Sequence, residues 1–292
     1  MSLRLLLGER ANDLLKSWPT EPFVHRRGTL DLDRDIPLSA MEAYIDYDLL
    51  DPRYVAVVKN GTAVHPGRFS REGRMSPGKL RGLMEEGHTV NLREVQRSVP
   101  YLAQASRMLQ LETGYANYVS AIITPGGEQG LAHHWDQFTG IIAQVAGCKK
   151  WLLWEPVVEY PMDDYQSSPK MWSPELQKHV EETPPDRQYE LRPGDTLVLP
   201  RGWLHCPRAV GVATSFHLTF AVKERSRLWL AQQLLGMAIE EPAFRREVPA
   251  GSFTRPFEPE VRDVIRRAQD FLAQLDPAVV AEQIRRDALT SE

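Results

Sequence analysis

The clearest pattern of hydrophobic and polar positions lies between residues 118 and 222, where short apolar runs alternate with turn residues. Runs rich in β-branched and aromatic residues occupy 118–124, 138–145, 149–155, 196–199 and 214–222, and this texture predicts five strands. Glycine and proline turns separate the runs, as in Pro125-Gly126-Gly127 and Pro193-Gly194-Asp195. Many short strands with such punctuation favour a jelly-roll or cupin core, the double-stranded β-helix.

Helical periodicity flanks this core. Leu102, Ala105, Met108 and Leu109 recur at helical spacing and predict an amphipathic helix over 101–111. From 224 onward the texture is helical, with an apolar stripe that runs through Val261, Val264, Ile265, Ala268, Phe271, Leu272 and Leu275. The stripe either packs within its own domain or forms a homodimer contact. We therefore expect a mainly β, α+β protein with a cupin-type domain over 1–222, including helices before the core, and a helical region over 223–292.

One long stretch between strands does not fit the jelly-roll pattern. Residues 163–189 are polar and carry four prolines. We expect an insertion between strands, which forms either a lid over the site or a surface excursion.

Composition narrows the possible classes of protein. The chain has 292 residues, 42% of them hydrophobic and 25% charged, as in an ordinary globular protein. A net charge of −4 gives no electrostatic reason for general nucleic-acid binding. The N-terminal apolar run is too short for a signal peptide, and no later run has membrane-spanning length, so we expect a cytoplasmic protein. Cys148 and Cys206 are too few for a disulfide framework.

The candidate chemistry lies in His134-Trp135-Asp136 and in His205, far along the chain. Residues i and i+2 of an extended segment point to the same side, so His134 and Asp136 can reach one ion while Trp135 points away. Two imidazoles and one carboxylate form the facial triad of Fe(II) oxygenases, which leaves positions open for a substrate and dioxygen. A lone His-x-Asp triplet is also common in ordinary loops, so its neighbours decide the interpretation.

A strand near the end of the core has one polar face. Ser215, His217 and Thr219 alternate with Phe216, Leu218 and Phe220. A polar face inside a barrel needs polar partners, which predicts that it lines the active site. His217 is either a binding residue or a structural histidine with satisfied hydrogen bonds.

Four segments in order resemble one known family. The segments are 123–136, 144–151, 191–205 and 215–219. They are similar to JmjC oxygenases of the ribosomal-oxygenase (cupin-4) group, which hydroxylate proteins with Fe(II), 2-oxoglutarate and dioxygen. The resemblance covers about 90–222 strongly and the following helices weakly.

The resemblance implies roles for individual residues. It makes His134, Asp136 and His205 the iron ligands, and Lys149 the cation that binds the distal carboxylate of 2-oxoglutarate. His217 then lies near the iron or the co-substrate without being a ligand. On a strand Lys149 shares a face with Trp151, whereas Lys150 points away; a solvated lysine is the alternative interpretation of Lys149.

Two departures from the family pattern limit what can be carried over. A tyrosine common in the family is replaced by Ile122, so either another hydroxyl donor assists Lys149, for which Ser120, Thr139 and Ser215 are candidates, or the pocket binds 2-oxoglutarate more weakly. The family's ribosomal members also carry a winged-helix domain, for which we expect no room after residue 224. This second departure affects the expected substrate more than the expected chemistry.

Three functions follow as hypotheses. The first is an Fe(II)- and 2-oxoglutarate-dependent dioxygenase that hydroxylates a protein or peptide side chain, with ribosomal proteins among the candidate targets. The second is the same chemistry on a small molecule or natural-product peptide. The third is a non-catalytic cupin-like binding module, which the intact triad disfavours. We expect no membrane partner, and a homodimer through the C-terminal helices is possible.

Overall fold

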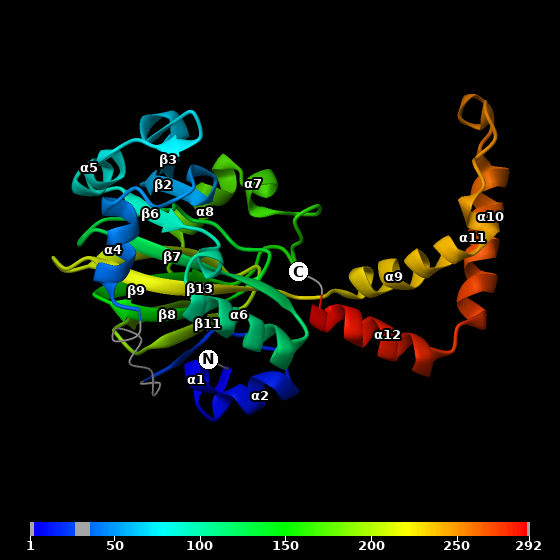
Figure 1. Cartoon of the computed structure of the whole chain (residues 1–292), viewed down its shortest axis with the longest axis horizontal. Helices are drawn as coiled ribbons and strands as arrows, with labels where there is room; N and C mark the ends of the chain where they lie inside the picture. The colour runs from blue at the N-terminus through cyan, green and yellow to red at the C-terminus, as the bar shows by residue number, and fades with distance from the viewer. Residues whose placement is uncertain (1–2, 27–35, 291–292) are drawn as a thin grey trace. The chain divides into compact units, whose positions relative to one another are not determined.

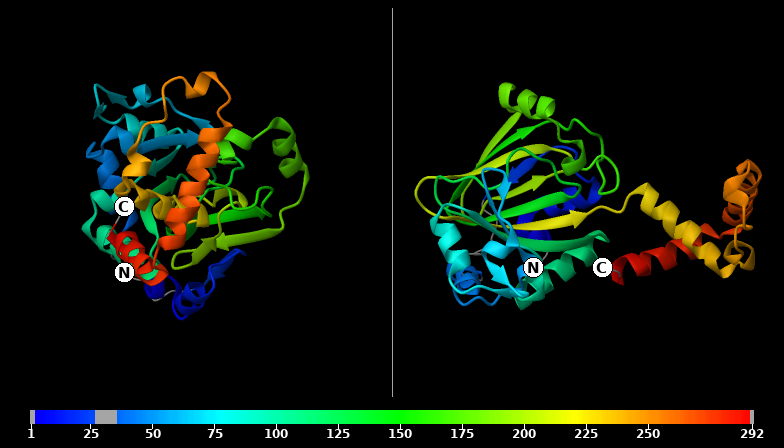
Figure 2. Two further views of the ribbon diagram at one scale, coloured as in Figure 1. Left: turned by 90° about the vertical axis from the view of Figure 1, so that its right-hand side faces the viewer. Right: turned by 90° about the horizontal axis from the view of Figure 1, so that it is seen from above.

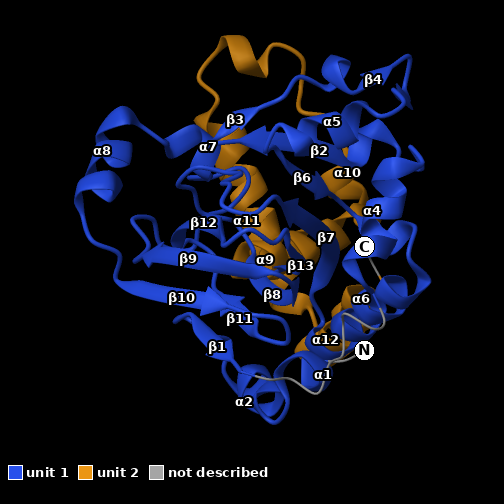
Figure 3. Ribbon diagram, turned by 90° about the vertical axis from the view of Figure 1, so that its left-hand side faces the viewer, with its two compact units in different colours: residues 1–223 blue, residues 224–292 orange. Residues whose placement is uncertain are grey.

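The computed structural model of the chain describes residues 3–26 and 36–290. The chain divides into two compact units, residues 1–223 and 224–292 (Figure 3). The division falls one residue after the boundary expected from the sequence.

Unit 1 is built on antiparallel sheets (Figure 1). The larger sheet has the strand order β1 (Phe23–His25), β11 (Thr196–Leu199), β8 (Thr139–Ala146), β13 (Ser215–Lys223), β7 (Ala116–Thr124), β6 (Thr89–Leu92), β2 (Val55–Lys59), β3 (Thr62–Ala63). The smaller sheet has the order β10 (Arg187–Leu191), β9 (Cys148–Trp154), β12 (Leu204–Val210). A separate hairpin joins β4 (Ser70–Arg71) and β5 (Arg74–Met75). The two main sheets enclose the barrel interior (Figure 2), and the predicted jelly-roll core is confirmed.

The five strands predicted from alternation are all present, each within two residues of its expected ends. Strand β13 pairs with β7 on one side and β8 on the other. Its alternation arises because its two faces meet different surroundings: Phe216, Leu218 and Phe220 pack in the main hydrophobic cluster, whereas the polar residues between them face the barrel interior.

The structure adds strands where the pattern predicts none. Strand β12 contains Pro207, which cannot donate a backbone hydrogen bond and is tolerated because β12 is an edge of the smaller sheet. Strand β10 begins inside the expected insertion and is the other edge, with a partly exposed polar sequence. Strand β6 is only four residues long, too short for its alternation to be recognised.

Helices cover the outer face of the larger sheet. They are α1 (Leu3–Leu7), α2 (Arg10–Lys16), α4 (Leu38–Asp46), α5 (Lys79–Glu85) and α6 (Pro100–Thr113). The predicted 101–111 helix is α6, which starts at a proline and ends at Gly114 in the left-handed conformation. Its Leu102 and Leu109 pack with Phe216 and Leu218 of β13 in the main hydrophobic cluster. Full burial of each such side chain contributes about 1.5–3 kcal/mol to folding. Met108 of the predicted stripe is instead at the surface.

The inner face is filled partly by a second apolar cluster. Its members come from both sheets and are Ile142, Trp151, Leu153, Leu191, Leu197, Leu199 and Trp203. The indole N–H of Trp203 donates to the carbonyl of Thr20, 2.9 Å away. This cluster fills the interior beside the polar positions of β7, β9 and β13, and a cavity lies next to those positions.

The expected insertion contains α7 (Ser168–Met171) and α8 (Pro174–Glu182). Unit 2 consists of α9 (Arg227–Gly236), α10 (Pro242–Arg245), α11 (Glu258–Gln274) and α12 (Pro277–Thr290). The predicted apolar stripe lies on α11, where Val261, Val264 and Ile265 are exposed. Among the described residues, no helix combines the length and apolarity that crossing a membrane requires.

Gly147 provides a test of the turn that leads into β9. Its φ is +62°, and a Cβ there would lie 2.2 Å from the carbonyl oxygen of Thr214. We expect Gly147→Ala to lower the free energy of unfolding by about 2–4 kcal/mol, as measured by urea denaturation. Gly211 also has a positive φ of +77° but open space around it, so Gly211→Ala should cost only about 1 kcal/mol. Equal losses would contradict the proposed clash.

Candidate metal and co-substrate site

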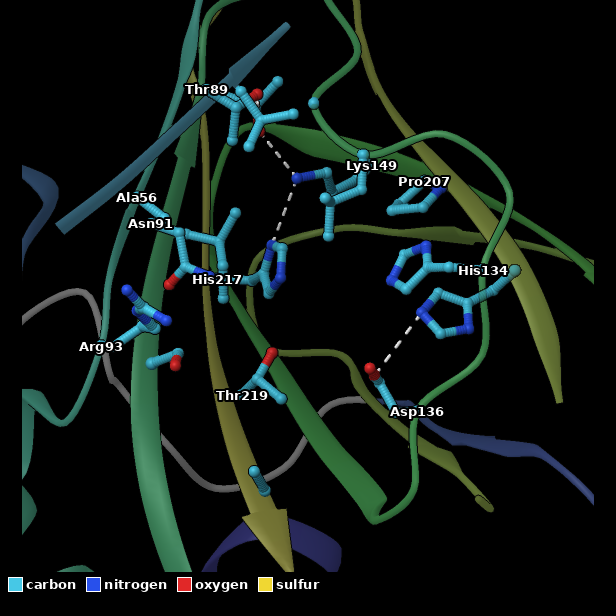
Figure 4. Close-up of a pocket in the computed structure, with 18 of the residues that line it drawn as sticks. Ala56, Thr89, Asn91, Arg93, His134, Asp136, Lys149, Pro207, His217 and Thr219 are labelled. Atoms are coloured by element: carbon cyan, nitrogen blue, oxygen red, sulfur yellow. Dashed lines mark hydrogen bonds and ion pairs between the residues drawn. The ribbon is translucent and has the colours of Figure 1, made fainter. Parts of the chain in front are cut away.

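The structure brings His134, Asp136 and His205 together. One ligand atom from each lies within 4.8 Å of the others. The imidazole rings have centroids 4.1 Å apart, and Nε2 of His205 is 3.7 Å from Oδ2 of Asp136 (Figure 4). The three residues predicted from the spacing therefore form one cluster.

Backbone hydrogen bonds position the cluster. His134 and His205 form an isolated antiparallel bridge, with N–H···O distances of 3.2 and 2.8 Å. The N–H of Gly202 donates to the carbonyl of Asp136 at 2.9 Å. The loop after β7 and the start of β12 are thus joined at the ligands themselves.

The tautomers of both histidines follow from their hydrogen bonds. Nδ1 of His134 lies 2.8 Å from the carbonyl oxygen of Ala132, and Nδ1 of His205 lies 2.9 Å from that of Trp203. A carbonyl only accepts, so each Nδ1 carries the proton. Each Nε2 therefore keeps its lone pair for a metal ion, with the ring orientation fixed by the bond at Nδ1.

Burial shifts the pKa values of His205 and Asp136 in opposite directions. It lowers the pKa of the His205 imidazole well below its ordinary value, which keeps this ligand neutral. It raises the pKa of the Asp136 carboxyl, an effect that the neighbouring His134 partly offsets. An ionised Asp136 thus needs a cation close by. Two imidazoles whose Nδ1 atoms are bonded to carbonyls and a carboxylate that needs a cation fit Fe(II), whose oxygenase sites use this donor set.

The neighbours of the ligands point away from the cluster. Trp135 is buried in an apolar cluster with Trp154 and Cys206, so its predicted direction agrees with the structure. His133 packs edge-on against Trp154, with ring centroids 5.0 Å apart. Burial raises the pKa of the Cys206 thiol to about 11, which disfavours the thiolate that a metal would bind.

The expected insertion packs against the back of the metal-binding segment. Oγ of Ser168 accepts a hydrogen bond from the backbone N–H of Trp135 at 3.2 Å. The rings of Trp172 and Trp135 have centroids 5.8 Å apart. The insertion therefore supports the loop that carries His134 and Asp136.

Lys149 lies inside the barrel, as its strand position predicts. It is only 2% exposed, and its Nζ donates to Oγ1 of Thr124 at 2.8 Å. Nζ also lies 3.5 Å from Nδ1 of His217, and Thr89 donates to the Thr124 hydroxyl at 3.1 Å. Desolvation lowers the pKa of the Lys149 amine to about 7. No carboxylate within reach balances its charge among the described contacts, so the site suits an incoming anion.

One cavity of about 230 Å³ joins Lys149 to the metal cluster. Its polar lining includes Ser120, His217 and Thr219, which share inner faces of β7 and β13. Ile122 also lines it, at the position where the resemblance expects a tyrosine.

Two predicted binding residues lie elsewhere. Ser215 is fully buried and its hydroxyl accepts from Nε2 of Gln144 at 2.9 Å, outside the cavity lining. The register of β13 against β7 is unbroken, with Ser215 opposite Thr124, so Ser215 keeps the predicted inner face, but its hydroxyl is engaged by Gln144 beyond the end of the cavity. Thr139 shares a face of β8 with Ile141, on the helix-covered side. Neither residue supplies the hydroxyl donor that replaces the missing tyrosine.

The hydroxyl that lies beside Lys149 in the cavity belongs instead to Thr124. Sequence reasoning missed Thr124 together with Thr89, Asn91, Arg93 and Tyr118, all of which line the cavity. Three of these five lie in or directly after β6, which the pattern did not predict. For Thr124 and Tyr118 the signal was available, because they share the i, i+2 face of Ser120 in the predicted strand 118–124.

Comparison with known proteins agrees with this geometry. Residues 92–228 match the family model of JmjC domains, so this part of the chain is similar to JmjC domains. Ribosomal oxygenase 1 of Danio rerio is 28% identical over 183 residues, which are 61% of this chain and 32% of that protein. The bifunctional lysine-specific demethylase and histidyl-hydroxylase NO66 of Aedes aegypti is 28% identical over 155 residues, 53% of this chain and 24% of that protein. The chain thus spans about a third or less of the length of these two relatives.

A solved structure shares the fold. It is that of YcfD, a ribosomal oxygenase from Escherichia coli in complex with cobalt and 2-oxoglutarate. The TM-score is 0.58 at 16% identity, and the match covers 97% of this chain and 72% of that chain.

The metal cluster predicts a sharp contrast between two adjacent histidines. We expect His134→Ala to weaken binding of Co(II), used as a probe for Fe(II), at least about 100-fold in calorimetry, because it removes a ligand. His133→Ala should bind Co(II) like the unmodified protein, since His133 contacts Trp154 instead. Circular dichroism would establish that both variants fold. Equal losses in the two variants would refute the ligand assignment.

Proposed function

We propose that the chain is an Fe(II)- and 2-oxoglutarate-dependent dioxygenase that hydroxylates a side chain of a protein or peptide. One observation carries the proposal: the His134, Asp136 and His205 cluster and the buried Lys149 amine line the same cavity. The printed names of the relatives, which include an oxygenase and a histidyl-hydroxylase, support the reaction class.

Each end of the cavity suits one end of 2-oxoglutarate. The triad would hold Fe(II) and leave positions for the keto acid end. Lys149, with the Thr124 hydroxyl, would bind the distal carboxylate through charge-assisted hydrogen bonds. His217 lies between these ends. It contacts Lys149 at one end, and its ring centroid is 5.6 Å from that of Trp151, which also lines the cavity.

Fe(II), 2-oxoglutarate and dioxygen supply the oxidation, in which one oxygen atom enters a C–H bond of the target and the other enters succinate as CO2 is released. The protein's part is placement and exclusion of water. The Nδ1 hydrogen bonds hold the imidazoles in position. The apolar Trp151 and Ile122 limit water around the site.

The partner, compartment and assembly are proposed from the sequence. A protein or peptide target follows the relatives' names, and a ribosomal protein is one candidate. A cytoplasmic location and a homodimer through the helices of unit 2 stay predictions.

Anaerobic spectroscopy tests the reaction class. Fe(II) with 2-oxoglutarate should give the weak visible charge-transfer band of a chelated keto acid. With oxygen and lysate peptides, mass spectrometry should then detect the gain of one oxygen atom together with succinate. Absence of the band in metal-loaded protein would refute the proposal, and a band without any modified peptide would favour a small-molecule target.

Lys149 provides a second test, because the same amine should destabilise the free protein and bind the co-substrate. The folded-state pKa of about 7 lies below the ordinary 10.5, so the protonated amine destabilises the free protein. This cost is full below pH 7, shrinks above it and vanishes above about pH 10.5. We expect Lys149→Met to raise the free energy of unfolding at pH 7 by on the order of 2 kcal/mol. It should also weaken 2-oxoglutarate binding at least about 100-fold.

Lys150→Met is the matched control, because Lys150 lies on the opposite face of β9. Lys150→Met should leave unchanged both the pH dependence of the free energy of unfolding and the affinity for 2-oxoglutarate. Urea denaturation and the charge-transfer titration measure both quantities. Unchanged affinity in Lys149→Met would show that another group binds the distal carboxylate.

A further inference from the structure

Arg93 is a second cation that lines the cavity. It follows β6 directly, and its backbone N–H donates to the carbonyl of Tyr54 at 2.7 Å, which fixes the start of the side chain. Its guanidinium makes one long hydrogen bond, 3.4 Å, to the carbonyl of Arg53. Within residues 3–26 and 36–290 it has no ion-pair partner, although most exposed arginines of this chain do. Arg93 therefore keeps most of its donors for a ligand.

Asn91 lies next to Arg93 on the inner face of β6. The register places Asn91 between Ala56 of β2 and Ile122 of β7, whose side chains offer no hydrogen bond. Its Oδ1 is buried and has no partner among the described residues. A buried polar atom without a partner costs free energy unless a ligand satisfies it. A free guanidinium and an unsatisfied amide thus face the same cavity.

The two cations serve different ends of the cavity. Figure 4 shows Lys149 beside His217, while Arg93 and Asn91 lie together across the cavity from His134 and Asp136. Arg93 is also close to Tyr118, since its charge partly offsets the burial that raises the pKa of that phenol. Lys149 is buried, whereas Arg93 is exposed. The buried cation suits the co-substrate and the exposed one suits a group that enters from solvent.

A charge count supports this division. Fe(II) and Lys149 together carry the same formal charge, with opposite sign, as Asp136 and the 2-oxoglutarate dianion. Among the acidic residues, lysines and arginines of the lining, which are Arg93, Asp136 and Lys149, Arg93 is then the charge left uncompensated in the loaded cavity. A cationic target would be repelled there, and an anionic one attracted.

We propose that Arg93 binds a carboxylate group of the target, so that the target is an acidic side chain of a peptide or a small carboxylic acid, and arginine and lysine targets are excluded. This inference rests on the proposed function. The guanidinium would hold the carboxylate through paired hydrogen bonds, and Oδ1 of Asn91, which only accepts, would take an N–H of the target beside that carboxylate. Arg93 is a specificity residue and takes no part in the oxidation.

A panel of targets tests the specificity. Peptide mixtures with a fixed central Glu, Asp, Gln, Asn, Lys or Arg and randomised flanks are incubated with the Fe(II) protein, 2-oxoglutarate and oxygen. Small carboxylic acids form a separate arm. We expect oxygen to be added to acidic peptides or to free acids at least about tenfold faster than to the matching amides. Which arm reacts identifies the source of the carboxylate.

Substitutions at Arg93 then connect the preference to this residue. Arg93→Gln should abolish the preference for acid over amide, Arg93→Lys should keep part of it, and Arg93→Glu should shift it toward Lys and Arg peptides. Arg71→Gln is the control, because Arg71 is an exposed arginine of β4 whose only ion pair is a 3.7 Å contact with Glu72. It should retain the preference.

The charge-transfer titration distinguishes failure of the proposed function from failure of the carboxylate proposal. If the band never forms, the proposed function fails. The carboxylate proposal is overturned if the band forms but no panel member gains oxygen, if amides or cationic targets react as well as acids, or if Arg93→Gln leaves the preference intact. It is also overturned if Arg93→Gln weakens 2-oxoglutarate binding tenfold or more, because Arg93 would then belong to the co-substrate site.

Discussion

Two backbone hydrogen bonds between His134 and His205 are the interaction on which the rest of the site depends. They join a loop after the larger sheet's β7 to the first residues of β12 in the smaller sheet. Because the ligands are themselves the bonded residues, any separation of the two segments would also separate the ligand atoms. The Nδ1 bonds to the carbonyls of Ala132 and Trp203 then fix the rings. The donor set is thus held in place before any metal binds, which lowers the ordering cost of binding.

The inner face of the barrel must bury polar groups, and it does so in two ways. Nε2 of Gln144 donates to the Ser215 hydroxyl and to the carbonyl of Ala146, which holds the turn between β8 and β9. The hydroxyls of Thr89 and Thr124 and the Lys149 amine form a chain that still has capacity for an anion. A polar inner residue is therefore a binding candidate only when its partners leave some of its hydrogen-bonding capacity unused.

Much of the fold and the metal cluster could be predicted from the sequence, because they depend on local patterns. Alternation located β7, β8, β9, β11 and β13, and the His-x-Asp spacing with His205 identified the ligands. The direction of Lys149 followed from strand geometry once β9 was recognised. These predictions needed only a period of two and residue chemistry.

The remaining parts depend on tertiary context. Strand β6 is stabilised by its neighbours β2 and β7 and not by its own four residues, so Asn91 and Arg93 could not be assigned to the cavity. Ser215 keeps the predicted face of β13, but its hydroxyl is engaged by Gln144 of the neighbouring strand, a partner that alternation alone does not identify. Thr139 was assigned by its position near the site, although its face of β8 packs under the helices. Pairing and register decide such cases, and both are set by distant residues.

The buried Lys149 amine makes co-substrate capture a proton-coupled event. In the free protein its pKa of about 7 means that a large share of the molecules carry a neutral amine near neutrality. A bound carboxylate would favour the charged amine, so binding would draw a proton from solvent. As pH rises above 7, fewer molecules would hold the charge in advance, and apparent affinity would fall. Under the proposed function, the affinity of the barrel interior for 2-oxoglutarate thus depends on the pH of the surrounding solution.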